Sequence, residues 1–183
     1  GFGREPVPPP PFNQVGAALQ ARFDSLNDPA FASCSPHGLV RQATSGHPLK
    51  ITQYQDYVVF EYEQNSIRRV IYLDGRSTGT TGLSAYGRHT ARYEGGALIV
   101  ESSQLTGRLT GVRGNELSDE SRVTETYRRI DSPETGPAIG MRLVVNDPGH
   151  LTATWELGWR KNYAATDYHF VDTECMIPLS AGD

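Results

Sequence analysis

The sequence has 183 residues, which is enough for one domain with a sizeable core. Its net charge of −4 and its lack of a basic stripe argue against a nucleic-acid-binding protein. No apolar run approaches the roughly 20 residues that span a bilayer, so we expect a soluble protein without membrane insertion.

Residues 1–12 carry five prolines and are expected to form a stiff N-terminal arm, because proline lacks the backbone donor that helices and sheets need. In residues 13–26, apolar residues recur at helical spacing after Asn13, a typical N-cap. The pattern predicts one short amphipathic helix that packs against the rest of the domain. Residues 27–47, rich in serine, proline and glycine, are expected to be a loop.

Residues 49–175 alternate apolar and polar positions in segments of about six to ten residues, separated by turn residues. The predicted strands are residues 50–54, 57–63, 67–74, 88–94, 97–104, 120–130, 141–146, 150–159 and 166–174. Short connections favour a meander, and closure would leave no exposed strand edge. We therefore predict that residues 13–183 form an all-β domain, a single antiparallel barrel of about eight or nine strands with a ligand-sized interior. A two-sheet sandwich is the alternative.

The two cysteines, Cys34 and Cys175, lie near opposite ends of the predicted domain. A disulfide between them would close a loop of about 140 residues and would stabilise the fold by at most roughly 5 kcal/mol. Two separate buried thiols are the alternative. Neither cysteine has ligand-type neighbours at the usual spacing, so no metal site is predicted. The chain begins with glycine rather than methionine, so we expect that an upstream signal peptide or tag has been removed.

Four motifs occur in order along the chain. Residues 71–76 read IYLDGR, residues 92–101 read RYEGGALIVE, residues 123–129 read VTETYRR, and residues 147–155 read DPGHLTATW. Together they resemble a family of exported bacterial proteins, mostly uncharacterised, with lipocalin-like barrels. The resemblance implies a lipocalin-like barrel, a periplasmic or secreted location and a Cys34–Cys175 bridge. It implies no settled activity.

Four positions depart from the family pattern. Tyr93 stands where the family has tryptophan. His89 stands where the family usually has serine, and Arg88 stands where it usually has histidine. Leu117 stands where a histidine commonly precedes a serine and an acid. These changes gather at one loop-rich end, so we expect a site there to differ from that of the family.

Strand alternation indicates which side chains face the interior. The strand that contains His89 has one strongly charged face that should contact water, which points His89 and Tyr93 inward. In the strand that contains Glu125, this residue and Tyr127 lie on the more apolar face. The pattern favours neither face for Arg69.

A carboxylate and an imidazole that meet in an apolar cavity can act as general base and acid on a bound molecule. Tyrosine and arginine can donate hydrogen bonds to a developing oxyanion. The predicted catalytic residues are therefore His89, Glu125, Tyr72 and Arg69. Further residues predicted to bind the ligand are Tyr93, Tyr127, Trp155, Tyr168 and Glu61. The alternative is that Glu125 forms a salt bridge with an arginine on an adjacent strand and that His89 is a hydrogen-bonded residue at the rim.

No dinucleotide, P-loop, nucleophile-elbow or metal motif occurs, so no cofactor is predicted. The leading hypothesis is a cofactor-independent lyase, hydratase or isomerase that moves protons on a small aromatic or apolar substrate. The alternative is a non-catalytic periplasmic carrier of a small apolar ligand. A third hypothesis is an interaction module that uses the Pro-rich arm, and a homodimer is a further expectation.

Overall fold

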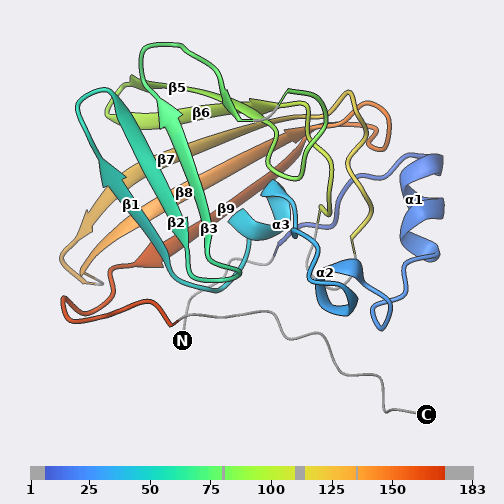
Figure 1. The fold of residues 1–183 in the computed structure, drawn as a ribbon, viewed down its shortest axis with the longest axis horizontal. Coiled ribbons are helices and arrows are strands. Elements are labelled where there is room, and N and C mark those ends of the chain that lie inside the picture. Colours follow the sequence, from blue (N-terminus) through green and yellow to red (C-terminus); the bar gives the residue numbers. More distant parts are fainter. Residues whose placement is uncertain (1–6, 80, 110–113, 135, 172–183) are drawn as a thin grey trace.

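The computed structural model describes residues 7–79, 81–109, 114–134 and 136–171, in which two antiparallel sheets dominate (Figure 1). The first sheet has the order β1 (Leu49–Gln53), β2 (Tyr57–Tyr62) and β3 (Ile67–Tyr72). The second has the order β4 (Thr78–Gly79), β5 (Arg88–Glu94), β6 (Ala97–Ser103), β7 (Arg122–Ser132), β8 (Gly136–Asn146) and β9 (Trp155–Asn162). Each strand pairs with the next one along the chain in its sheet, so the predicted all-β meander is confirmed.

The described strands do not close into a barrel. β3 and β4 belong to different sheets, so the smaller sheet ends at β1 and β3 and the larger sheet ends at β4 and β9. β1–β3 instead cross in front of β5–β9 (Figure 1). The ladder breaks at β4 because the Gly- and Ser-rich segment before β5 contributes a strand of only two residues.

The closing strand predicted for residues 166–174 is wrong for its described part, because residues 166–171 form no strand. Residues 172–174 lie outside the described ranges. A side chain bridges the place where β9 would have met the segment before β1: Lys161 Nζ donates hydrogen bonds to the backbone oxygens of Ser45 (3.0 Å) and His47 (2.8 Å).

The hairpin between β5 and β6 forms where the sequence predicts it. Its two turn residues, Gly95 and Gly96, both have positive φ, 54° and 74°. Two successive residues in this conformation are typical of the tight turn that matches the twist of paired strands, and glycine adopts it without strain. The turn sets the register of the whole hairpin and thereby places His89 opposite Ser102.

The N-terminal helix is shorter than predicted. α1 (Gln14–Ala21) begins after Asn13, whose side chain accepts a hydrogen bond from the Gly16 amide at 2.9 Å, so the predicted N-cap is confirmed. The predicted apolar face is wrong in part: Val15 is 55% exposed, and Gly16 is the buried residue of the helix. Gly16 is buried because α1 packs so closely that an added Cβ atom would meet the backbone oxygen of His150.

We expect Asn13→Ala to lower the free energy of unfolding by about 0.5–2 kcal/mol, since the variant loses the cap. It also loses the hydrogen bond from Asn13 Nδ2 to the Gly149 oxygen (2.9 Å). Urea unfolding would measure the loss. Asn27→Ala is the control, because within the described ranges the Asn27 side chain makes a single, exposed hydrogen bond, to Asp24, and a loss as large as that of Asn13→Ala would contradict the capping role.

Two further helices lie in the segment that was predicted to be a loop. α2 (Pro29–Ala32) is capped by Asp28, and all five residues of α3 (Leu39–Ala43) are buried. Helices of four and five residues are too short to show a helical period in sequence, which is why the prediction missed them. No helix in the described ranges combines the length and the hydropathy that a bilayer crossing requires.

The described part of the Pro-rich arm lies on the domain. The Pro8 oxygen accepts a hydrogen bond from Trp155 Nε1 (2.8 Å), and the Pro11 oxygen accepts one from the Thr152 amide (2.8 Å). Phe12 pairs with Leu151 as an isolated bridge. These contacts use the backbone acceptors that proline retains.

The core has two apolar clusters. The first gathers around α3 and one end of β7–β9, and includes Leu39, Val40, Leu143 and Trp155. The second fills the space between the two sheets, and includes Phe60, Ile71, Val100, Tyr127 and Met141. Trp159 packs against both clusters. The buried polar residues described next lie in the second region.

Candidate functional site

Six polar side chains meet between the two sheets, and we call them the inter-sheet cluster. They are Tyr62 on β2, Arg69 on β3, His89 on β5, Ser102 on β6, and Glu125 and Tyr127 on β7. Each exposes 4% of its surface or less. Strand alternation places all six at inward positions. Buried ionisable groups are costly unless paired, so this cluster is the first candidate for function.

Arg69 and Glu125 join the two sheets. Arg69 Nη2 lies 2.7 Å from Glu125 Oε2, and Nη1 lies 3.2 Å from Oε1, which is a two-pronged ion pair. The Tyr127 hydroxyl also donates to Glu125 Oε1 at 2.5 Å. Burial opposes the charge of Arg69, but the Glu125 carboxylate beside it holds the pKa of the guanidinium well above its ordinary value. The ion pair therefore persists in the interior.

His89 is neutral and acts as an acceptor. Its Nδ1 atom lies 2.8 Å from Ser102 Oγ and 3.4 Å from Arg69 Nη2. Because arginine can only donate, Nδ1 accepts and the ring proton resides on Nε2. Burial, together with the Arg69 charge, lowers the pKa of His89 to about 2. At neutral pH His89 thus has no proton to give as imidazolium.

The two tyrosines of the cluster are protonated phenols. Burial is the main cause that raises the pKa of Tyr62, and it raises that of Tyr127 further, with the Glu125 charge adding to the effect. Tyr62 accepts a hydrogen bond from Arg69 Nη1 at 2.9 Å. Tyr127 donates its phenolic proton in a hydrogen bond to Glu125, so it is the tyrosine of the cluster that contacts the carboxylate.

Two buried polar groups at this site lack a hydrogen-bond partner among the described residues, Arg69 Nε and the Tyr86 hydroxyl. Burial raises the pKa of Tyr86, whereas the positive charge of Arg69 lowers it, which indicates that the hydroxyl lies within reach of the Arg69 charge. A buried polar group without a partner costs about 1–3 kcal/mol, so an additional oxygen acceptor here would be stabilising.

The structure brings together four of the residues predicted for the site: His89, Glu125, Arg69 and Tyr127. The alternative prediction for Glu125 also describes this geometry, since Glu125 is paired with an arginine, although Arg69 lies on the facing sheet rather than on an adjacent strand. His89 is hydrogen-bonded in the interior rather than at the rim.

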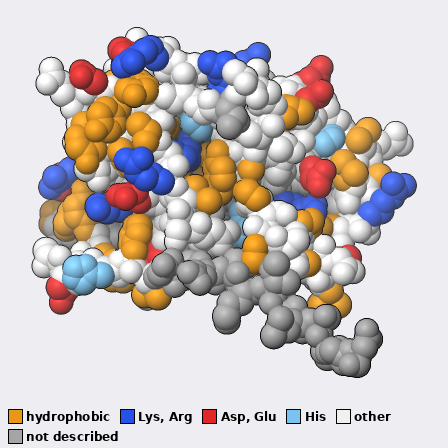
Figure 2. Space-filling model, viewed as in Figure 1, with side chains coloured by type: hydrophobic (Ala, Val, Ile, Leu, Met, Phe, Trp, Pro, Cys, Tyr) orange, Lys and Arg blue, Asp and Glu red, His pale blue; other side chains and the backbone are white. Residues whose placement is uncertain are grey.

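Tyr72 and Glu61 lie on the opposite, outward face of β1–β3, so the prediction that they join the site is wrong. Tyr72 is three residues from Arg69, and strand alternation puts only one of the two inward. Its ring packs under the guanidinium of Arg76 (4.0 Å), and Glu61 pairs with Lys50 (3.3 Å). Hydrophobic side chains gather over this face together with charged ones (Figure 2).

Three aromatic residues predicted to bind ligand lie elsewhere. Tyr93 is half exposed beside the hairpin turn, where it accepts a hydrogen bond from Gln53. Trp155 is buried at the far end of β9 in the first apolar cluster. Tyr168 donates to Glu63 from the segment that forms no strand.

The prediction missed Tyr62, Ser102 and Tyr86. The register of the Gly95–Gly96 hairpin was a usable signal for Ser102, since counting from the turn sets it opposite His89. Alternation in β2 left both faces similarly apolar, so Tyr62 had no distinguishing signal. Tyr86 lies in the irregular segment before β5 and had none either.

Of the two cysteines, Cys34 is described and Cys175 lies outside the described ranges, so the Cys34–Cys175 bridge stays a prediction. Across the described ranges, no three histidine, cysteine, aspartate or glutamate side chains gather as a set of metal ligands.

The chain matches no family model, no curated protein sequence and no solved structure. The resemblance to exported lipocalin-like proteins therefore stays an expectation from the sequence.

Proposed function

We propose that the chain binds a small molecule between its two sheets, at the inter-sheet cluster. The observation that carries the proposal is the pair of buried, unpartnered groups, Arg69 Nε and the Tyr86 hydroxyl. A ligand oxygen, as in a carbonyl, carboxylate or phenol, would accept from both. An aromatic or apolar body would pack against Phe60, whose ring lies 5.3 Å from the Arg69 guanidinium, and its neighbours in the second apolar cluster.

The seam between β3 and β4 is the proposed entrance. Among the described residues, no strand pairing joins β3 to β4, so opening the seam there breaks no described backbone ladder. Arg69 lies on one side of this seam, in β3, and Tyr86 and His89 lie on the other. The pocket over β5–β7 that is described below is lined by neither Arg69 nor Tyr86, and in this proposal the ligand reaches these two residues by opening the seam.

A lipocalin-like barrel exported to the periplasm belongs to the same proposal. Its support is the meander order of the strands, the two facing sheets and the four sequence motifs. In that setting the non-catalytic carrier of a small apolar ligand is the simplest function, because the Arg69–Glu125 pair is already satisfied without a substrate.

The second candidate is a cofactor-independent lyase, hydratase or isomerase, and the Tyr127–Glu125 contact favours it. A protonated phenol 2.5 Å from a carboxylate is an acid and a base held side by side. Glu125 would take a proton from the ligand, Tyr127 would return one, and Arg69 would stabilise the developing oxyanion. His89, as a neutral acceptor, would position Arg69 rather than act as the acid.

Thermal-shift measurements with small aromatic and apolar compounds that carry a carbonyl, carboxylate or phenol, followed by mass spectrometry of the recovered compound, test the proposal. We expect one class to stabilise the protein by about 2.7 kcal/mol at a hundredfold excess over Kd. Tyr86→Phe should weaken that binding about two- to tenfold, the value of one hydrogen bond. Tyr72→Phe, on the outward face, is the matched control.

Each outcome has a defined meaning. A bound compound recovered unchanged supports the carrier. A compound recovered with altered mass, or as an isomer, supports the enzyme, and Glu125→Gln should then abolish turnover. If no compound binds, or if Tyr86→Phe and Tyr72→Phe bind equally well, the inter-sheet cluster is not a ligand site.

A further inference from the structure

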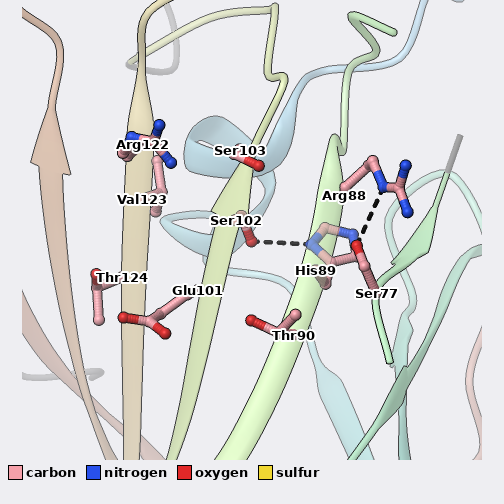
Figure 3. A pocket seen from close by; sticks show the side chains of 10 residues that line it. All are labelled: Ser77, Arg88, His89, Thr90, Glu101, Ser102, Ser103, Arg122, Val123 and Thr124. Carbon is pink, nitrogen blue, oxygen red and sulfur yellow. Dashed lines mark hydrogen bonds between the residues drawn. The ribbon is translucent and has the colours of Figure 1, made fainter. Parts of the chain in front are cut away.

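A second candidate site lies on the outer face of the larger sheet, directly behind His89 and Ser102 of the inter-sheet cluster. A pocket of about 290 Å³ opens over β5, β6 and β7. The residues that line it are Ser77, Arg88, His89, Thr90, Glu101, Ser102, Ser103, Arg122, Val123 and Thr124 (Figure 3). His89, Ser102 and Val123 are inward-facing residues and form its floor; the other strand residues alternate outward.

Two arginines and a serine form one row across the three strands. Arg88 on β5 pairs with Ser103 on β6, and Ser102 pairs with Val123 on β7, so Ser103 neighbours Arg122. Adjacent strands lie about 4.8 Å apart, which puts the two arginine Cα atoms about 10 Å apart with Ser103 between them. Figure 3 shows both guanidinium groups at the same end of the pocket, on opposite sides of Ser103, with that of Arg88 directed toward Ser77.

Most of the donors in this row are unused. Arg88 Nε donates to Ser77 Oγ at 3.1 Å, and its two Nη groups have no partner among the described residues. Arg122 makes no hydrogen bond or ion pair with any residue in the described ranges. Because Arg88 and Arg122 lie in strands, the positions of their Cα atoms are fixed, while their guanidinium groups remain available to a ligand.

The only carboxylate among the lining residues is Glu101, and Arg92 Nη1 binds it at 2.7 Å. The acidic residues within three positions of Arg122 along the chain, Asp119, Glu120 and Glu125, do not line the pocket. The pocket therefore carries a local positive charge on a chain whose net charge is −4. Two arginines at this spacing attract an anion.

We propose that this pocket binds a phosphate or sulfate monoester of a small molecule. A planar carboxylate can be satisfied by one arginine, whereas a tetrahedral oxyanion presents oxygens toward donors on several sides. Arg88, Arg122 and the Ser103 hydroxyl approach from three neighbouring strands. The next row, Thr90, Glu101 and Thr124, offers hydroxyl and carboxylate groups to the polar remainder of the ester. The volume suits a small molecule.

Isothermal titration calorimetry in phosphate-free buffer tests the proposal, with inorganic phosphate, inorganic sulfate, glycerol phosphate and acetate as the probes. We expect glycerol phosphate to bind more tightly than acetate by at least tenfold, and its affinity to fall as salt is added. Arg88→Gln and Arg122→Gln should each weaken binding about tenfold, because each removes one charge-assisted contact. Arg128→Gln is the matched control: it changes the same charge on the same strand and face, outside the pocket.

Three results would overturn the proposal. The first is no binding of phosphate or its ester at millimolar concentration. The second is equal binding of acetate, or an equal loss in Arg128→Gln, which would show an unspecific charge effect. The third is binding to phosphatidylcholine vesicles that contain phosphatidic acid without binding to glycerol phosphate, which would make a lipid the source of the phosphate. Tyr86→Phe should leave the titration unchanged, which separates this site from the proposed function.

Discussion

Replacing Glu125 with leucine should lower the free energy of unfolding by about 3–5 kcal/mol, and Arg69→Met should do the same. Either change leaves the other charge buried without its partner, 4% exposed or less. The double variant Arg69→Met/Glu125→Leu should recover most of this loss, because two apolar residues replace the pair and no charge remains in the interior. Urea unfolding of the four proteins, combined as a double-mutant cycle, measures the coupling.

The exposed pair Arg142–Glu156 provides the control cycle. Its atoms lie as close, 2.6 Å, but its side chains are 57% and 52% exposed, so its coupling should stay below about 1 kcal/mol. If the double variant at Arg69 and Glu125 lost as much stability as the two single variants together, the pair would not act as a unit. Because Arg69→Met alone should greatly lower the free energy of unfolding, a loss of ligand binding in that variant would be ambiguous. Tyr86→Phe is therefore the variant that tests ligand binding.

Acidification should destabilise the protein from about pH 6.5 downward, above the range in which carboxylates usually titrate. Burial, together with Arg41, lowers the pKa of His37 to about 4, and burial with Arg69 lowers that of His89 to about 2. Between these values and 6.5 the unfolded chain binds protons that the folded chain does not. Stability present above pH 6.5 is therefore lost as the pH falls, at about 1.4 kcal/mol per pH unit for each histidine.

Urea unfolding at intervals from pH 7 to pH 4.5 would measure this slope. His37→Gln and His89→Gln should each remove about half of it, whatever the substitution does to stability at pH 7. Glu63 and Asp74, whose pKa values are lowered by hydrogen bonds, act in the same direction at lower pH. A wild-type free energy of unfolding that stays constant from pH 7 to pH 5 would show that both imidazoles are protonated without cost in the folded state.

Much of the inter-sheet cluster could be predicted where the chain alternates strictly. In β5 and β7 the outward positions are charged or hydroxylated, so His89, Glu125 and Tyr127 were assigned to the interior, and the structure places them there. The position of the Gly95–Gly96 turn also determines the register of the hairpin, which pairs His89 with Ser102. Local sequence carries this information because period and turn geometry are properties of neighbouring residues.

The assignment of Arg69 and Tyr72 required the fold. β3 carries apolar residues on both faces, so its sequence has no preference, and the facing carboxylate of Glu125 decides which polar residue is buried. The same holds for the helix α3, whose short segment is stabilised by burial in the first apolar cluster.

The sequence by itself determined the antiparallel meander, its best hairpin, the Asn13 cap and the inward faces of β5 and β7, because each depends on residues close together in the chain. Only the tertiary structure decided that the strands divide into two sheets and that Arg69 meets Glu125. The same is true of the row in which Arg88, Ser103 and Arg122 share one outer pocket. Those outcomes depend on the burial and charge of residues that are distant in sequence, and no local pattern records them.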